Sequence, residues 1–498
     1  MKRFTILALA VAVLGTLTAC DDFLDVNDDP NNASPEQVAG EPGLVFIDAA
    51  AQLASNKNIE IIGQNSFAQT WASAGGAGVF NNPELYSVST FTTGNTWNQT
   101  YTDVGENLEQ IIDAAEAAEE GSLPTDKNNI AAQAKILQAY AYFNLTQMFG
   151  AVPASQANEV DEFPNPAPDA QEDVLRFVID QIDEAINQIN FDQPGIQDRD
   201  VFYNGNMDQW RKFGNTIKLR ALLLLDSGGQ DVAGEINSLL DQPLIRTNAD
   251  NMLFPFSGNQ GNENNFFQLS QDFSFDADGD GAPDNIWYAC NSELVTRMKN
   301  ETSVTDPRLS TYCARNASGE FVGSGPGDFV PVPALGGTSS AISANIHRPT
   351  YPERFATAAE VLLKEAEWAL RQGNTSVAQQ KLEDGVTASM DFFDEQPGAI
   401  PQADKQAFVD ALPDLASLSQ EEALTFIRTQ QWLDLFERHP ENWTHWRRTK
   451  TPELEAPTNA QLGTIIRRYE YPPDPVATNP NLPPTQQQET PMWFEGSN

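Results

Sequence analysis

Apolar residues recur every three or four positions over much of this chain, which is the spacing of one face of an α-helix. The stripe is clearest over residues 129–149, where it comprises Ile130, Ala134, Leu137, Ala141, Leu145 and Met148. Tyr140 and Phe143 widen this apolar face, so we expect the helix to pack on two sides. Gly150 and Pro153 follow it and predict its end.

The same periodicity predicts five further helices. Asp169, with Glu172 three residues later, is typical of the N-terminal cap of a helix, and Ser419 with Glu422 forms a second pair of this kind. The predicted helices follow Asp169 and cover residues 207–225, 353–371, 377–390 and 419–438. Neighbouring helices of this length predict a mostly α fold built from tetratricopeptide-like pairs, although a strict repeat of about 34 residues is absent.

Residues 242–351 interrupt the helical pattern. Gly, Pro, Asn and Ser are dense there, and no long amphipathic stretch occurs. Segments without regular structure seldom exceed about 15 residues unless they are functional. We therefore expect a large irregular region of binding loops on top of the helical scaffold, and an extended Pro-rich tail from Tyr471 onward.

The first 35 residues have the pattern of an exported lipoprotein. Lys2 and Arg3 precede an apolar run over residues 4–17, which is shorter than the roughly 20 residues of a membrane-spanning helix. Residues 17–20 read Leu-Thr-Ala-Cys, similar to a bacterial lipobox. We predict a signal peptide over residues 1–19, Cys20 as the residue acylated by fatty acids such as palmitate, a tether over residues 20–35 and a single domain over residues 36–498.

Composition excludes several classes of function. The formal net charge of −41 opposes binding to nucleic acid, and no second long apolar run is present, so lipid alone is expected to hold the chain at a membrane. No nucleophile elbow, zinc-ligand set, phosphate-binding loop or dinucleotide fingerprint occurs, and we predict that the protein is not an enzyme. Cys290 and Cys313 predict either one disulfide or two separately buried thiols.

Several motifs along the whole chain resemble those of SusD/RagB-type lipoproteins. They are residues 139–145 (AYAYFNL), 148–153 (MFGAVP), 209–212 (QWRK), 427–432 (IRTQQW), 441–449 (ENWTHWRRT) and 467–472 (RRYEYP). The last three resemble the ending of a SusD-like subgroup. Asp21 and Asp22, directly after Cys20, are similar to the surface-export signal of these lipoproteins.

The resemblance implies a function. Proteins of this kind are lipid-anchored at the outer face of the Bacteroidetes outer membrane, and each forms a lid over a SusC-like TonB-dependent transporter. They bind nutrients, most often glycans and sometimes peptides. We expect a carbohydrate-binding nutrient-uptake protein that delivers an oligosaccharide to its transporter. The alternatives are peptide binding on the same scaffold, or a lid without its own small ligand.

Sugar binding requires exposed aromatic rings beside amides and carboxylates. Trp71, Phe80 and Tyr86 flank the Gly-rich residues 75–78, while Trp287 and Tyr288 lie in the irregular region. These five residues are the predicted ligand contacts, and the alternative for each is a place in the core. Trp97, which opens a predicted helix, is assigned to the core.

Residues 276–284 resemble the start of a calcium loop. Asp276, Asp278, Asp280 and Asp284 provide carboxylates at positions one, three, five and nine, and Gly281 provides the turn. Position twelve, where an EF-hand has Glu, is Trp287. We predict a Ca²⁺ site that rigidifies the loop carrying Trp287; the alternative is an acidic surface turn.

Overall fold

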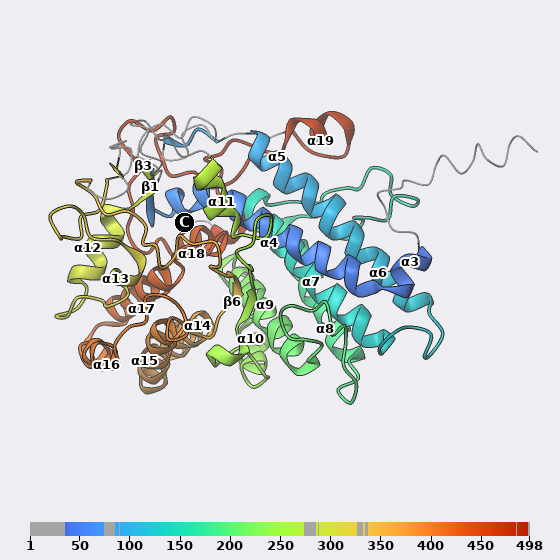
Figure 1. Ribbon diagram of the computed structural model, residues 1–498, viewed down its shortest axis with the longest axis horizontal. Coiled ribbons are helices and arrows are strands. Elements are labelled where there is room, and N and C mark those ends of the chain that lie inside the picture. Colours follow the sequence, from blue (N-terminus) through green and yellow to red (C-terminus); the bar gives the residue numbers. More distant parts are fainter. Residues whose placement is uncertain are drawn as a thin grey trace, which may run out of the picture.

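The computed structural model describes residues 35–73, 85–88, 90–272, 285–286, 288–325, 332–333, 337–484 and 486–496. Helices dominate these residues, and only short strands accompany them (Figure 1). The prediction of a mostly α fold with paired helices is confirmed.

Helix α7 (Lys127–Phe149) is the centre of the first half of the chain. Consecutive helices pack on one another, α6 on α7, α7 on α8 and α8 on α9. Every residue of α7 from Asn129 to Phe149 is buried, which confirms packing on two sides. The other helices of this half are α3 (Pro35–Gly40), α4 (Pro42–Phe67), α5 (Thr90–Gln99), the π-helix η4 (Thr100–Gly105), α6 (Glu106–Ala117), α8 (Gln171–Gln188), α9 (Met207–Ser227) and α10 (Ala233–Leu240).

The predicted cap of α8 is wrong. Ala170 occupies the N-cap position, and no side chain caps the helix. The Asp169 carboxylate instead accepts hydrogen bonds from the backbone amides of Ala154 and Ser155, both at 2.9 Å. Asp169 thus fastens the segment after α7 to the start of α8, a contact that sequence spacing does not reveal.

The start of the helix predicted over residues 353–371 is also different. Residues Glu353–Ala356 form strand β6, which pairs antiparallel with β2 (Met252–Phe254), and α14 begins at Ala358. The described residues contain two more antiparallel pairs, β1 (Trp71–Ser73) with β4 (Tyr288–Cys290) and β3 (Asn285–Ile286) with β5 (Val332–Pro333). Pairing with a strand about a hundred residues away overrides the local helical pattern.

A second group of helices, α14 to α17, lies on the other side of the molecule in Figure 1, and α18 lies nearer the middle, where it contacts α4. Helix α14 packs against α15 and α17, and the Ser419–Glu422 capping box of α17 is present as predicted. The remaining elements are η5 (Asn248–Asp250), α11 (Asn265–Asp272), α12 (Ser292–Asn300), α13 (Leu309–Tyr312), α14 (Ala358–Arg371), α15 (Thr375–Asp391), α16 (Gln402–Asp410), η6 (Leu415–Ser417), α17 (Gln420–Asp434), α18 (Glu441–Thr449), α19 (Pro473–Thr478) and η7 (Trp493–Glu495).

A buried ionic network joins the two groups of helices. The guanidinium of Arg220 in α9 binds Glu360 of α14 at 2.7 Å and Glu441 of α18 at 2.8 Å. Arg438 binds the same Glu360 carboxylate at 2.6 Å. Burial opposes ionisation of Glu360, but these two cations overcome it and hold its pKa well below the ordinary value. Glu360 is therefore a charged carboxylate at the junction of three helices.

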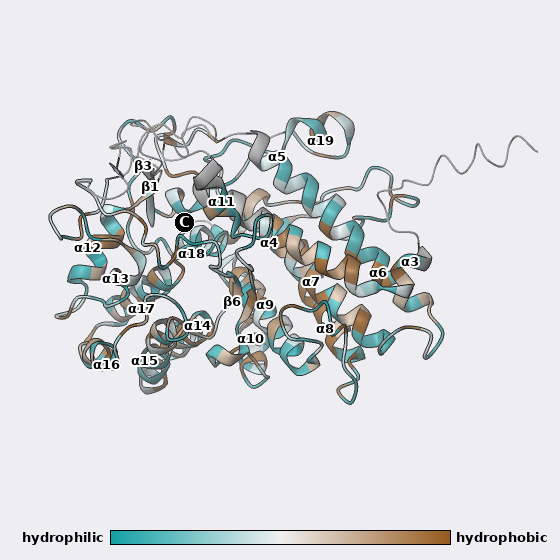
Figure 2. Cartoon of the chain, in the orientation of Figure 1, coloured by the Kyte–Doolittle hydropathy of each residue, from teal (hydrophilic) through white to brown (hydrophobic). Residues whose placement is uncertain are grey.

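Figure 2 shows hydrophobic residues concentrated on α6, α7 and α8, and many of their side chains belong to the main hydrophobic core. The tail is not wholly extended, because residues Pro473–Thr478 form helix α19 beside α5. The end of the described chain is fixed by Glu495, whose carboxylate binds Lys450 and Arg467.

Candidate functional site

Two of the rings predicted to contact ligand are buried in a second hydrophobic core. Trp71 is 0% exposed and Tyr288 is 3% exposed. The Trp71 ring packs against Phe266 at 4.7 Å and against Tyr288 at 5.3 Å between centroids. The prediction that these rings are exposed is wrong, because the pairing of β1 with β4 turns both side chains inward.

Tyr86 is also buried, with 2% of its surface exposed. Its ring meets Phe67 of α4 in an edge-on contact with centroids 6.0 Å apart. The residue adopts a left-handed backbone conformation, with φ at 60°, and its side chain belongs to the main core. The prediction of an exposed Tyr86 is therefore wrong.

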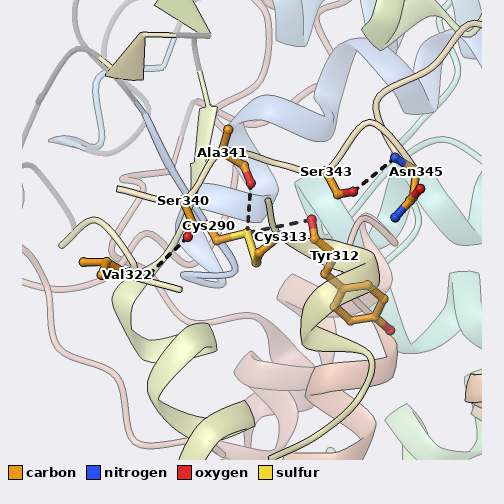
Figure 3. The surroundings of a disulfide bond; sticks show 8 residues. All are labelled: Cys290, Tyr312, Cys313, Val322, Ser340, Ala341, Ser343 and Asn345. Atoms are coloured by element: carbon orange, nitrogen blue, oxygen red, sulfur yellow. Dashed lines mark hydrogen bonds between the residues drawn. A yellow bond between two sulfur atoms is a disulfide. The ribbon is translucent and has the colours of Figure 1, made fainter. Parts of the chain in front are cut away.

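The two cysteines of the irregular region form a disulfide (Figure 3). Cys290 ends β4, Cys313 follows α13, and their Cα atoms are 6.1 Å apart. The backbone amide of Cys290 donates to the carbonyl of Ser340 at 2.9 Å. The segment that contains Ser340 is therefore hydrogen-bonded to the strand that carries the disulfide. Of the two alternatives for these cysteines, the structure contains the paired form.

Other predicted site residues lie outside the described residues. They are Cys20, Phe80, Trp287, Asp276, Asp278, Asp280 and Asp284. In the part of the chain that the structure describes, no group of three or more His, Cys, Asp and Glu side chains is arranged to hold a metal ion. The calcium loop and the acylated cysteine therefore remain predictions from the sequence.

A pocket with several aromatic residues in its walls lies between α5, η4, the segment after α7 and α19, and has a volume of about 700 Å³. Figure 1 shows α5 and α19 side by side at this edge of the molecule. The lining includes Trp97, Asn98, Tyr101, Asp103, Glu106, Asn158, Val160, Phe163, Asp474, Thr478 and Asn479. We call it the α5–α19 pocket.

Aromatic rings form the floor of the α5–α19 pocket. Trp97 is 4% exposed and contacts Tyr101 at 5.4 Å and Phe149 at 5.1 Å between centroids. This confirms its place in the core, although its accessible edge still lines the pocket. The hydroxyl of Tyr101 donates to the carbonyl of Pro153 at 2.8 Å, and burial raises the pKa of Tyr101 well above its ordinary value.

The outer walls carry groups that contact solvent. Val160 is 68% exposed, Phe163 is partly exposed, and Asn98 is exposed on α5. The side-chain amide of Asn479 holds the walls together by donating to the carbonyl of Pro166 at 2.8 Å. The pocket thus combines a fixed frame with accessible apolar, amide and carboxylate groups.

A second cavity of about 700 Å³ lies between α15, η5 and β2. Its lining residues, all described, include one aromatic residue, Phe392. Asp391 in its wall is paired with Lys405 at 2.7 Å, and Arg246 with Glu365 at 2.6 Å. With one ring, and with Arg246, Asp391 and Asp394 held in ion pairs, this cavity fits a sugar less well than the α5–α19 pocket.

Sequence reasoning missed the α5–α19 pocket because its walls come from three distant segments. The sequence contains one indication of these walls, the Pro-rich stretches around Pro164 and Pro475, because residues of both stretches line the pocket. Each was visible in the sequence, but their proximity was not.

A family model described as "Starch-binding associating with outer membrane" matches residues 32–472. The chain belongs to the SusD-like family. The SusD/RagB resemblance is thereby confirmed, and the family is one described as associated with the outer membrane. Within the described ranges, no helix combines the length and the hydrophobicity that crossing a bilayer requires.

Solved structures show the same SusD-like fold. A chitin-binding protein aligns with a TM-score of 0.75 at 21% identity, over 91% of this chain and 99% of the other. A SusD homologue from Bacteroides fragilis gives 0.70 at 22%, over 92% and 99%. A chitin-binding SusD homologue from Flavobacterium johnsoniae gives 0.67 at 20%, over 90% and 98%. No curated protein matches the SusD-like chain at a significant level.

Proposed function

We propose that this SusD-like protein captures an oligosaccharide in the α5–α19 pocket at the cell surface and delivers it to a SusC-like transporter. The observation that carries the proposal is the combination of accessible rings, amides and carboxylates around one cavity of about 700 Å³. Ring faces suit the C–H surface of a sugar, and amides and carboxylates suit its hydroxyls.

The relatives support this class of ligand. The family description names starch, and two of the similar structures are described as chitin-binding. The family description names binding and no catalysis, which supports the prediction of a non-enzyme. Peptide binding remains the competing function, and the same assay tests both ligands.

We expect Phe163→Ala to weaken oligosaccharide binding about tenfold, which corresponds to ~1.4 kcal/mol. The variant removes a partly exposed ring at the mouth of the pocket and leaves the floor around Trp97 in place. Isothermal calorimetry with starch and chitin oligosaccharides, and with a peptide panel, provides the measurement.

Two bulky substitutions separate the α5–α19 pocket from the second cavity. Thr478→Trp fills the α5–α19 pocket from α19 and should abolish binding, whereas Thr387→Trp fills the second cavity from α15 and should not. The proposal is wrong if Thr387→Trp alone abolishes binding, or if the wild-type protein binds only peptides.

We also propose that residues 276–284 bind Ca²⁺ through Asp276, Asp278, Asp280 and Asp284. Adding a chelator is expected to lower the melting temperature by a few degrees, because the ion holds like-charged carboxylates together. The variant Asp278→Asn with Asp280→Asn should lack this response. An identical melting curve with and without chelator would count against the site.

A further inference from the structure

The α5–α19 pocket has an uneven distribution of charge. Its lining contains the carboxylates of Asp103, Glu106 and Asp474. None of its lining residues, all of which are described, is Lys, Arg or His. A ligand in this pocket therefore meets three negative charges and no compensating cation.

A second hollow of about 340 Å³ adjoins the pocket across the segment after α7. Ala157 lines both cavities, and Asn158 of the pocket is followed by Glu159 of the hollow. On α6, Glu106 lines the pocket and Glu109, three residues on, lines the hollow, so both lie on one side of the helix. The two cavities are consecutive sites along one surface.

The hollow is more acidic than the pocket. Its lining carries six carboxylates, from Glu109, Asp113, Glu116, Glu159, Asp180 and Glu184. The one cation in this lining, Lys135, already pairs with Glu116 at 2.8 Å and with Glu184. Burial, followed by the charges of Asp113 and Glu159, raises the pKa of Glu109. Negative charge is therefore in excess, and a cationic group would relieve the repulsion.

We propose that the α5–α19 pocket and the adjoining hollow select glycans by charge, and favour oligosaccharides with free amino groups over neutral ones and over uronic acids. The inference rests on the proposed function of the pocket. A protonated amine adds attraction to carboxylates that a hydroxyl or an acetamide does not, while the carboxylate of a uronic acid is repelled. The net charge of −41 also attracts cationic ligands, but it does so over the whole surface, so a variant of equal charge change at a distant place separates the two sources.

Three hexasaccharides of equal length test the proposal: glucosamine, N-acetylglucosamine and galacturonic acid. At slightly acidic pH and low salt, we expect the glucosamine oligomer to bind about tenfold more tightly than the N-acetylated one by calorimetry. The galacturonic acid oligomer should bind at least tenfold more weakly than the N-acetylated one. About 0.5 M salt should remove most of both differences, because it screens exposed charges beyond a few ångströms.

A triple variant locates the source of the selectivity. Asp113→Asn, Glu159→Gln and Asp180→Asn remove three exposed charges from the hollow. In this variant, the preference for the glucosamine hexasaccharide over the N-acetylglucosamine hexasaccharide should fall from about tenfold to about threefold. The matched control, Asp404→Asn, Asp410→Asn and Glu421→Gln, removes three exposed charges around α16 and α17, at the opposite end of the molecule in Figure 1, and should keep the ratio.

Equal affinities for the amine and N-acetyl oligomers at low salt would overturn the charge selection while leaving the glycan-binding function intact. A drop in the ratio with the control variant would overturn it too, because the effect would then come from net charge. If none of the three oligomers binds and starch oligomers also fail, the proposed function itself fails.

Discussion

Replacing Glu360 by Gln is expected to lower the free energy of unfolding by about 3–5 kcal/mol. Glu360 is 2% exposed and binds Arg220 and Arg438, whose side chains are also buried. In the described residues, Arg438 has no other carboxylate within ion-pair distance. The neutral amide of Gln would leave the buried Arg438 guanidinium without its counter-charge. An unpaired charge in the protein interior is strongly destabilising. Chemical denaturation measures the loss.

The control for this variant is Glu120→Gln, which changes an exposed carboxylate and should shift stability by no more than about 0.5 kcal/mol. The network also predicts a pH dependence. Because the folded pKa of Glu360 lies well below the ordinary 4.5, its stabilisation is complete above about pH 5 and is lost as the pH falls towards the folded value. Equal acid sensitivity in the wild type and Glu360→Gln would contradict this assignment.

Replacing Cys20 by Ala is expected to release the protein from the membrane and to abolish its contribution to nutrient uptake. The sequence around Cys20 predicts acylation, and a lipid is the only membrane attachment that the sequence suggests. Detergent partitioning and fractionation of cells should move the variant from the membrane to the soluble fraction. Growth on the glycan should fall to the level of a deletion strain.

The same variant should bind its oligosaccharide with unchanged affinity, because the α5–α19 pocket is built from Trp97 and residues after it. Ala19→Gly, which keeps a small residue before Cys20, is the matched control and should remain in the membrane fraction. A Cys20→Ala protein that stays with the membrane after a high-salt wash would contradict the anchor.

The helical scaffold was predictable because its signal is local. Residues 129–149 carry a complete apolar stripe, and the observed α7 differs from the prediction by two residues at its start. The Ser419–Glu422 box likewise involves only neighbours in the chain. Glu353–Ala356 was assigned to a helix because its partner, β2, lies about a hundred residues away and leaves no trace in the local pattern.

The site was harder to predict for the same physical reason. Trp71 stands before a Gly-rich stretch, which favours an exposed loop, but pairing of β1 with β4 buries its ring beside Phe266. Trp97 was correctly assigned to the core, and its second role in the pocket depends on Phe163 and Asp474 lining the same cavity. Contacts between segments so far apart are decided by the assembled fold and not by any one segment.

The position of α19 in the wall of the pocket has a consequence for the order of events during biosynthesis. Asn479 and Asn481, just after α19, attach it to Pro166 and Asn165, more than 300 residues earlier in the chain. The α5–α19 pocket proposed to bind the oligosaccharide is therefore complete only after almost the whole chain has been synthesised. Loss of the residues from Asp474 onward would remove one wall of the pocket, and with it Met492 and Phe494 of the main core.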